Sequence, residues 1–486
     1  MFTAKDGPVP EHDLLITGGT VLDPANKFEG IADIAISDGR IERIEKAGIS
    51  RRAAANVIDA TGKWVMPGLI DTHAHFAGRS ATWDPALGHG MLAAAGTTTA
   101  IDFGSTPEDL FDGTRRKGAG LNVGGLFILR PGQTINRDDP PPAEVRQIVA
   151  DALRRGALGL KIIGGYDPFT PEVTANIIAE CNHQRAYIGY HVGTKATGSR
   201  LDGLREVPSL VGGNGRVHVA HVNAYCRGSI LPSDQECAEA IEILLAKKGQ
   251  YTSEVHQAVP NGTSGRCAPD GQVLADVARN CLKLRGYPTT SHGIRQAVKD
   301  GYASAIREKD GRVVYVRGAE ALALFEELGT NCPLSFPVNL PSTAFTLTTA
   351  KDASGDFVVD AVSTDGGSHP RNIAIESTAA LVRFGALSPL EMASKLSWMP
   401  SRMFGLLDKG HFSPGADADV TVIDPERGKA TIGIVAGSVI MRHGQVTGSG
   451  GTVLVAREGE KSAKGSSLPH QVVDLTSSKL YTGYLD

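Results

Sequence analysis

From residue 65 onward, short apolar runs that end in Gly, Asp or His alternate with helix-like segments. This alternation is typical of a parallel sheet that is buried on both faces and connected by helices. Eight strands over about 340 residues predict a (β/α)8 TIM barrel with insertions, an α/β fold. The predicted strands are residues 65–70, 97–103, 123–129, 158–163, 186–191, 216–222, 249–255 and 358–364.

The segments on either side of this region have a different, β-rich pattern. Glycine-containing turns separate short strands expected at 13–16, 21–22, 31–36, 40–44 and 56–59, and strands return at 419–423 and 433–441. We expect these two segments to pair into one small β-sandwich domain that the barrel splits in sequence.

The chain is therefore expected to divide into four parts. Residues 1–66 and 412–445 would form the β-sandwich, residues 67–411 the barrel, and the Gly/Ser-rich residues 446–486 an extended C-terminal tail. The segment 256–350 is too long for one loop of a barrel and predicts extra helices, with residues 318–328 as a helical candidate.

Composition narrows the classes of protein only slightly. Hydrophobic residues make up 41% of the 486 and charged residues 21%, which allows a large core and excludes global disorder. A net charge of -4 argues against a nucleic acid or an acidic membrane as the main partner. The six cysteines form no CxxC pair, and no apolar run reaches the length of a signal peptide or a membrane span. We expect a cytoplasmic protein.

A His-x-His pair at the end of the first predicted barrel strand is the sharpest chemical signal. Positions i and i+2 of a strand point to the same side, so His73 and His75 converge at the carboxyl end of the strand. Two converging imidazoles suit a divalent metal such as zinc. An isolated His-x-His is nevertheless common, so a metal site is indicated only if further ligands lie at the ends of the other strands.

Lys161 lies inside the otherwise apolar fourth strand. An unpaired ammonium is costly to bury, and burial lowers the pKa of lysine and leaves a neutral amine. One outcome is reaction with carbon dioxide to give a carbamate whose two oxygens can bridge two metals. The alternative is a lysine at the rim that reaches solvent.

Polar residues also end three further strands. His191 closes the fifth strand, His221 lies near the end of the sixth, and Asp365 follows the eighth. His218 is three positions before His221 and faces the opposite side, so we expect it to pack or to support a ligand. A carboxylate such as Asp365 can bind metal and move a proton.

With these residues the chain resembles the amidohydrolase superfamily, in its cyclic-amidohydrolase branch of hydantoinases, dihydropyrimidinases and dihydroorotases. The segment 67–75 (PGLIDTHAH) matches the signature of that family, and residues 413–420 (SPGADADV) resemble the return strand of its β-sandwich. The resemblance implies a first metal on His73, His75 and Asp365 and a second on His191 and His221. It also implies that N6-carboxylated Lys161 bridges both metals, zinc first and manganese or cobalt as alternatives.

The resemblance implies catalytic roles as well. A metal-bridging hydroxide would attack the amide carbon, Asp365 would carry its proton to the leaving nitrogen, and Tyr166 would stabilise the oxyanion. Two departures from the branch are visible. Phe76-Ala77 replace the Leu-Arg of dihydroorotases, with Arg79 displaced by two positions, and Asp365-Gly366 replaces the Asp-His pair at the last metal ligand. The segment 156–160 and Thr364-Asp365-Gly366 instead resemble N-acyl-D-amino-acid deacylases.

The leading hypothesis is a hydrolase that cleaves a carbon–nitrogen bond, other than a peptide bond, in a hydantoin, dihydropyrimidine, imide or lactam. The alternatives are a deacylase of linear N-acyl (D-)amino acids, a deaminase, and a non-catalytic hydantoinase-like assembly protein. The resemblance also implies a homo-oligomer, a tetramer or dimer. The roles of Glu254 and His256 stay open, because a salt bridge at the rim explains both nearly as well as the pocket does.

Overall fold

The computed structural model describes residues 10–46, 48–78 and 80–483. Arg79 therefore lies outside the described residues. The eight predicted barrel strands correspond to nine strands of the structure, because the last one is divided into β17 and β18. They run parallel in the order β17-β12-β11-β10-β9-β8-β7-β6-β18, with β18 hydrogen-bonded to β6. Their bounds are β6 (Leu69–His75), β7 (Thr97–Ser105), β8 (Ala119–Ile128), β9 (Gly159–Ile163), β10 (Tyr187–His191), β11 (Val217–Val219), β12 (Tyr251–His256), β17 (Ala361–Ser363) and β18 (Gly366–Gly367).

The last barrel strand is interrupted at Asp365. β17 pairs with β12 before the interruption, and β18 pairs with β6 after it, with Gly366 opposite Ala74. Across the interruption the backbone N–H of Asp365 donates to the His73 carbonyl over 2.9 Å. The barrel therefore closes at Asp365.

Helices cover the outside of the barrel, as the βα alternation predicts. They bury apolar side chains against strands whose own residues are almost all buried. The helices are α1 (Leu87–Ala94), α2 (Pro107–Lys117), α3 (Pro142–Arg155), α4 (Pro171–His183), α5 (Leu201–Val211), α6 (Ser233–Leu245), α10 (Pro341–Thr349), α11 (Ala374–Arg383), α12 (Pro389–Ala393) and α13 (Met399–Met403).

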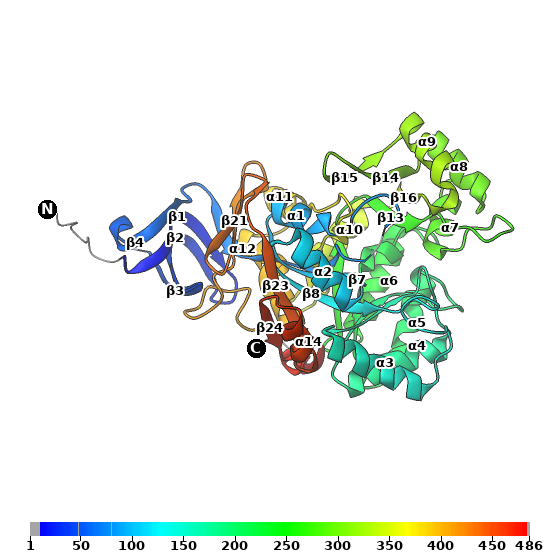
Figure 1. The fold of residues 1–486 in the computed structure, drawn as a ribbon, viewed down its shortest axis with the longest axis horizontal. Helices are drawn as coiled ribbons and strands as arrows, with labels where there is room; N and C mark the ends of the chain where they lie inside the picture. Colours follow the sequence, from blue (N-terminus) through cyan, green and yellow to red (C-terminus); the bar gives the residue numbers. More distant parts are fainter. Residues whose placement is uncertain (1–9, 47, 79, 484–486) are drawn as a thin grey trace.

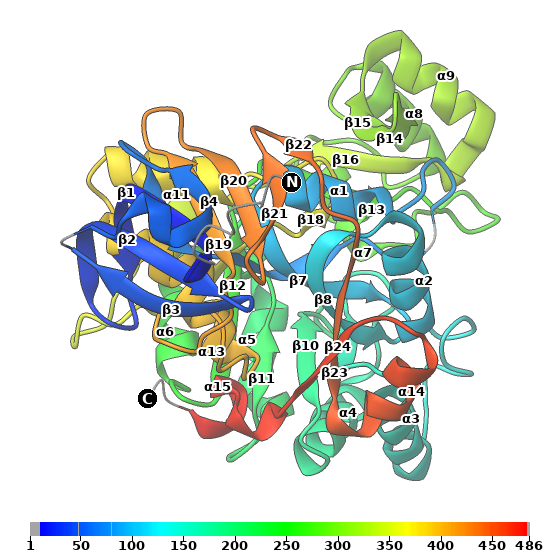
Figure 2. The ribbon, with the colours of Figure 1, turned by 60° about the vertical axis from the view of Figure 1, so that its left-hand side comes forward.

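The N-terminal segment and the first part of the C-terminal segment share one mixed sheet of nine strands, as expected from the sequence (Figure 2). β5 pairs with β1 from the first segment and with β19 from the second, and the apolar side chains of both segments form one core. The strands are β1 (His12–Asp23), β2 (Phe28–Ser37), β3 (Arg40–Glu45), β4 (Ala54–Asp59), β5 (Trp64–Pro67), β19 (Val420–Asp424), β20 (Lys429–Val435), β21 (Ser438–Arg442) and β22 (Gln445–Val446).

Some strands differ from the sequence prediction. The first barrel strand, expected at 65–70, is divided: β5 belongs to the mixed sheet, and the barrel strand β6 begins at Leu69. The strands expected at 13–16 and 21–22 are one strand, β1, because Gly18 adopts a φ of 71° in a bulge instead of ending the strand. The single strand expected at 433–441 is a hairpin instead. Ala436 and Gly437 both have positive φ there, the conformation of a tight two-residue turn.

The prediction of an extended C-terminal tail is wrong. After residue 446 the chain forms β23 (Gly450–Ala456), α14 (Glu460–Gly465), β24 (His470–Val473) and α15 (Lys479–Thr482). β23 pairs in parallel with the first half of β8, and β24 pairs with β23, so both join the barrel sheet. The apolar run at 453–456 is short and lies among glycines and polar residues, which hide the strand pattern.

The long segment after β12 forms a separate unit beside the mouth of the barrel (Figure 1). Its four strands, β13 (Pro260–Ser264), β14 (Ser304–Lys309), β15 (Arg312–Val316) and β16 (Pro333–Pro337), make an antiparallel sheet with its own apolar core. Its helices are α7 (Asp276–Lys283), α8 (Ser291–Lys299) and α9 (Gly318–Leu328), and α9 coincides with the expected helix 318–328. We call residues 260–337 the inserted unit.

Candidate metal centre and active site

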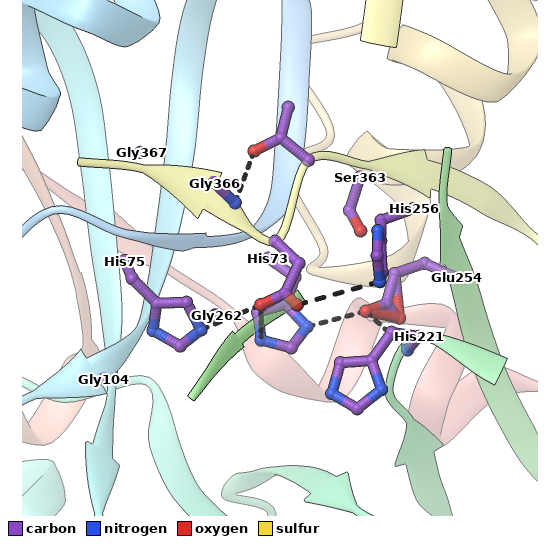
Figure 3. Close-up of polar contacts among 12 residues, drawn as sticks. His73, His75, Gly104, His221, Glu254, His256, Gly262, Ser363, Gly366 and Gly367 are labelled. Atoms are coloured by element: carbon purple, nitrogen blue, oxygen red, sulfur yellow. Dashed lines mark hydrogen bonds and ion pairs between the residues drawn. The ribbon is translucent and has the colours of Figure 1, made fainter. Parts of the chain in front are cut away.

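The two histidines of β6 meet Asp365 at the end of the barrel strand. Figure 3 shows His73 and His75 side by side at this end of the strand. His75 Nε2 lies 3.0 Å from Asp365 Oδ1, and His73 Nε2 lies 3.5 Å from the same oxygen. One ligand atom from each of the three residues can be chosen so that all lie within 4.8 Å of one another. Two imidazoles and a carboxylate at this spacing can hold one divalent ion.

The conformation and charge of Asp365 are both unusual. Its φ of 46° is in the left-handed region, and its carboxylate forms an ion pair with Arg371 at 2.7 Å. Burial alone would raise the pKa of this carboxyl. The Arg371 guanidinium and the hydrogen bond to His75 outweigh burial and hold the pKa of Asp365 well below its usual range.

Lys161 lies inside the barrel and does not reach the rim. Its side chain is buried, its Nζ has no hydrogen-bond partner among the described residues, and it sits 4.6 Å from the centroid of the Phe103 ring. Burial lowers the pKa of Lys161 to about 7. Burying an amine without a hydrogen-bond partner costs free energy. Conversion to a carbamate that binds metal would give the buried group partners and remove this cost.

The two remaining candidate ligands, His191 and His221, face each other. Their ring centroids are 4.5 Å apart, and the His221 ring is 5.2 Å from that of His73. His191 Nε2 is 2.9 Å from Ser199 Oγ, whereas His221 Nδ1 is buried without a partner. His221 follows β11 with a φ of 35°, the second non-glycine residue of the site in this rare conformation. The unpaired Lys161 and His221 atoms together fit a site that binds metal.

A cavity of about 330 Å³ connects all of these groups. It is lined by the six candidate ligands His73, His75, Lys161, His191, His221 and Asp365. The inserted unit contributes Asn261, Thr263 and Arg266 to the wall. From the sequence, these six residues are expected at or near strand ends, and the fold brings them to one place.

Tyr166 also lines the cavity, just after β9. Its hydroxyl donates to the Gly262 carbonyl over 2.9 Å, and its ring meets the ring of His191 edge to face. Burial raises the pKa of Tyr166 to about 12, so the phenol stays protonated near neutral pH. It can therefore donate a hydrogen bond into the cavity only by leaving Gly262.

Three residues around the site were missed or underestimated. Glu254 forms no salt bridge at the rim: it is fully buried and contacts His73 and His218. His218 is itself fully buried, as expected for a packed histidine. His256 is also fully buried, with Nε2 3.9 Å from Asp365 Oδ2. Arg371 carries no signal in a single sequence, because only the folded chain shows that it reaches Asp365.

The family of the chain follows from comparison with known proteins. The sequence model of the amidohydrolase family matches residues 64–449. The chain belongs to the amidohydrolase family. This amidohydrolase is 26% identical over 445 residues to a dihydroorotase from Trichlorobacter lovleyi, a match that covers 85% of the chain and 90% of the relative.

Two solved structures share the fold of this amidohydrolase at low identity. N-acyl-D-glutamate deacylase from Bordetella bronchiseptica superposes with a TM-score of 0.64 at 16% identity, covering 91% of this chain and 99% of that one. D-hydantoinase from Bacillus sp. AR9 superposes with a TM-score of 0.57 at 17% identity, covering 91% of this chain and 98% of that one. The family match and the dihydroorotase relative confirm the cyclic-amidohydrolase resemblance, and the protein is a hydrolase of carbon–nitrogen bonds. No helix in the described part of the chain has the length and hydropathy to cross a membrane.

Proposed function

We propose that this amidohydrolase binds two divalent metal ions and hydrolyses the carbon–nitrogen bond of a cyclic amide, such as a hydantoin, dihydropyrimidine, imide or lactam. The observation that carries the proposal is the set of six potential ligands around one cavity, with the buried amine of Lys161 unpaired among them. His73, His75 and Asp365 would hold one ion, and His191 and His221 the other.

Lys161 would bridge the ions as a carbamate. The neutral amine nitrogen adds to the carbon of carbon dioxide and releases a proton, and the product carries two oxygens for two metals. A lysine whose pKa is about 7 supplies neutral amine at physiological pH, whereas an exposed lysine is almost entirely protonated. Burial of Lys161 would thereby favour metal binding, because it keeps the amine neutral and able to form the carbamate.

Divalent ions bound here would lower the pKa of a water molecule and polarise the amide carbonyl. Asp365 lies against the two histidines, where its carboxylate would accept a proton from the nucleophile and pass it to the leaving nitrogen. Tyr166 would turn its O–H from Gly262 toward the carbonyl oxygen as negative charge develops there.

A deacylase of linear N-acyl amino acids is the second candidate. The deacylase structure superposes with the higher TM-score of the two neighbours. The cavity wall also carries two arginines. Arg130 forms an ion pair with Asp167 at 3.1 Å, whereas the Arg266 guanidinium makes no ion pair or hydrogen bond among the described residues. Such cations suit the free carboxylate of an N-acyl amino acid. A non-catalytic assembly protein is the weakest alternative, because every expected ligand lines the cavity.

One panel of substrates separates these functions. Hydantoin, dihydrouracil, succinimide and several N-acyl-D-amino acids would be assayed side by side with zinc-, manganese- and cobalt-loaded enzyme. We expect ring opening of at least one cyclic amide, with lower kcat/KM for the linear amides. The reverse order supports the deacylase, and no turnover of any compound by fully loaded enzyme contradicts both.

The homo-oligomer stays a prediction, which light scattering after size-exclusion chromatography would test.

A further inference from the structure

Glu254 connects three structural elements beneath the candidate metal centre. It is fully buried on β12, and its Oε1 lies 2.7 Å from His73 Nδ1 and accepts the backbone N–H of His221 over 2.8 Å. Its other oxygen lies 2.9 Å from His218 Nε2. Figure 3 shows the Glu254 carboxylate beside His73, on the side opposite His75.

The directions of these hydrogen bonds follow from the groups involved. A backbone N–H can only donate, and an ionised carboxylate can only accept, so Glu254 accepts from all three partners. His73 must then carry its hydrogen on Nδ1. Its Nε2 keeps a free lone pair, and this is the nitrogen that faces Asp365, 3.5 Å away. An imidazole binds metal through the nitrogen that carries no hydrogen.

The chain of hydrogen bonds continues beyond Glu254. If His218 donates from Nε2, its Nδ1 must accept, and the hydroxyls of Tyr187 and Thr252 lie 3.0 Å and 3.3 Å from it. All three side chains are almost completely buried. His218 therefore holds the second oxygen of Glu254 in place, so the carboxylate cannot rotate away from His73.

We propose that Glu254 is a positioning residue of the metal centre. It fixes the tautomer of His73, raises the basicity of its ligating nitrogen, and anchors the left-handed turn that presents His221. Glu254 does not line the cavity, so it acts through the histidines and does not touch substrate. The inference rests on the proposed function only in requiring that the site bind divalent metal.

The test compares Glu254→Gln with Glu236→Gln as a matched control. Glu236 is also a fully buried glutamate, and it accepts backbone N–H groups of Gly228, Ile230 and Leu231 instead of contacting a candidate ligand. The glutamine at 254 keeps the size of the side chain but loses its charge. A second variant, His218→Gln, removes the imidazole that supports Glu254.

Zinc affinity would be measured on the full-length chain, depleted of metal, by competition with a chelator. We expect Glu254→Gln to bind zinc roughly 10- to 100-fold more weakly than the wild type, His218→Gln to show a smaller loss, and Glu236→Gln to be unchanged. Long-range ¹H–¹⁵N spectra of histidine-labelled protein should show His73 protonated on Nδ1. Zinc affinity within twofold of the wild type in a folded Glu254→Gln variant, or protonation of His73 on Nε2, would overturn the inference.

Zinc binding does not depend on turnover, so the two proposals fail separately. If Glu254→Gln weakens zinc binding while the wild type hydrolyses none of the amides, the positioning role stands and the proposed function fails. If the wild type hydrolyses a cyclic amide and Glu254→Gln binds zinc normally, the proposed function stands and the positioning role fails.

Discussion

His75 Nε2 and Asp365 Oδ1 lie 3.0 Å apart, although 290 positions separate the two residues in the chain. The contact forms where β18 pairs with β6, which is also where the barrel closes. Closure of the fold and assembly of the first proposed metal site are thus the same structural event. A substitution that loosens this seam should weaken metal binding without removing any ligand.

Removal of metal should abolish activity. We expect enzyme treated with a chelator to be inactive and to recover with zinc, manganese or cobalt, because the chain's own groups offer no substitute for the Lewis acid. Metal content by mass spectrometry, measured beside the rate, checks this. Active protein with less than one metal per chain would contradict it.

Asp365→Asn should lower kcat by at least about 100-fold, because it removes a proton carrier and weakens one proposed metal ligand. Asp310→Asn is a matched control, since Asp310 is exposed and has a similar φ of 51°. Steady-state rates and metal content of both variants are the measurement. A rate for Asp365→Asn within a few-fold of wild type would exclude the proton-transfer role.

Lys161→Ala should lose the second metal and most of the activity, because no other described group in the cavity can replace the bridging carbamate. Short carboxylic acids should restore part of the rate by supplying two oxygens in its place. The control, Lys283→Ala, changes an exposed lysine at the end of α7. Turnover near wild type in Lys161→Ala would remove this residue from the mechanism.

Tyr166→Phe should lower kcat roughly 100-fold and leave KM nearly unchanged, because its O–H is needed only when charge develops on the carbonyl oxygen. Tyr287→Phe in the inserted unit serves as the control, because the half-buried Tyr287 donates to Asp300 over 3.0 Å and does not line the cavity. A loss confined to KM would instead indicate a role in ground-state binding.

A second buried lysine, Lys395, should make the free energy of unfolding depend on pH. Lys395 donates to the Val359 carbonyl inside the protein, and burial lowers its pKa from 10.5 to about 7. Between these two values the unfolded chain binds more protons at Lys395 than the folded one does. The free energy of unfolding should therefore rise with pH across this window, by up to about 1.4 kcal/mol per pH unit.

Comparison with Lys395→Met isolates this contribution. Unfolding by urea from pH 7 to pH 10.5 should show the wild type gaining stability relative to the variant as the pH rises. Parallel pH profiles for the two proteins would mean that Lys395 titrates normally in the folded state.

The sequence predicted the barrel and the candidate ligands because both depend on local patterns. A buried parallel strand is a short apolar run, and a polar residue at its carboxyl end faces the site, as for His73 and Lys161. Glu254 is equally close to a strand end. Its role depends on histidines from two other strands, and a glutamate in a buried network cannot be told from one at the rim by its position alone.

The final strands were mistaken for a tail for a related reason. β23 is stabilised by the edge of β8, and that edge is open only because β9 pairs with the second half of β8. Nothing near residue 450 indicates this vacant edge. Prediction therefore failed where a segment depends on a partner more than 300 positions away.

The position of the last strands also bears on how the protein is made. The N-terminal sheet is incomplete until β19 to β22 are available, and the barrel sheet lacks β23 until Ala456 has been synthesised. The apolar strands of the first 60 residues therefore lack their final partner strands during most of translation. We expect a nascent chain arrested before residue 420 to bind chaperones. Release of the completed chain should coincide with folding of the N-terminal sheet and the barrel.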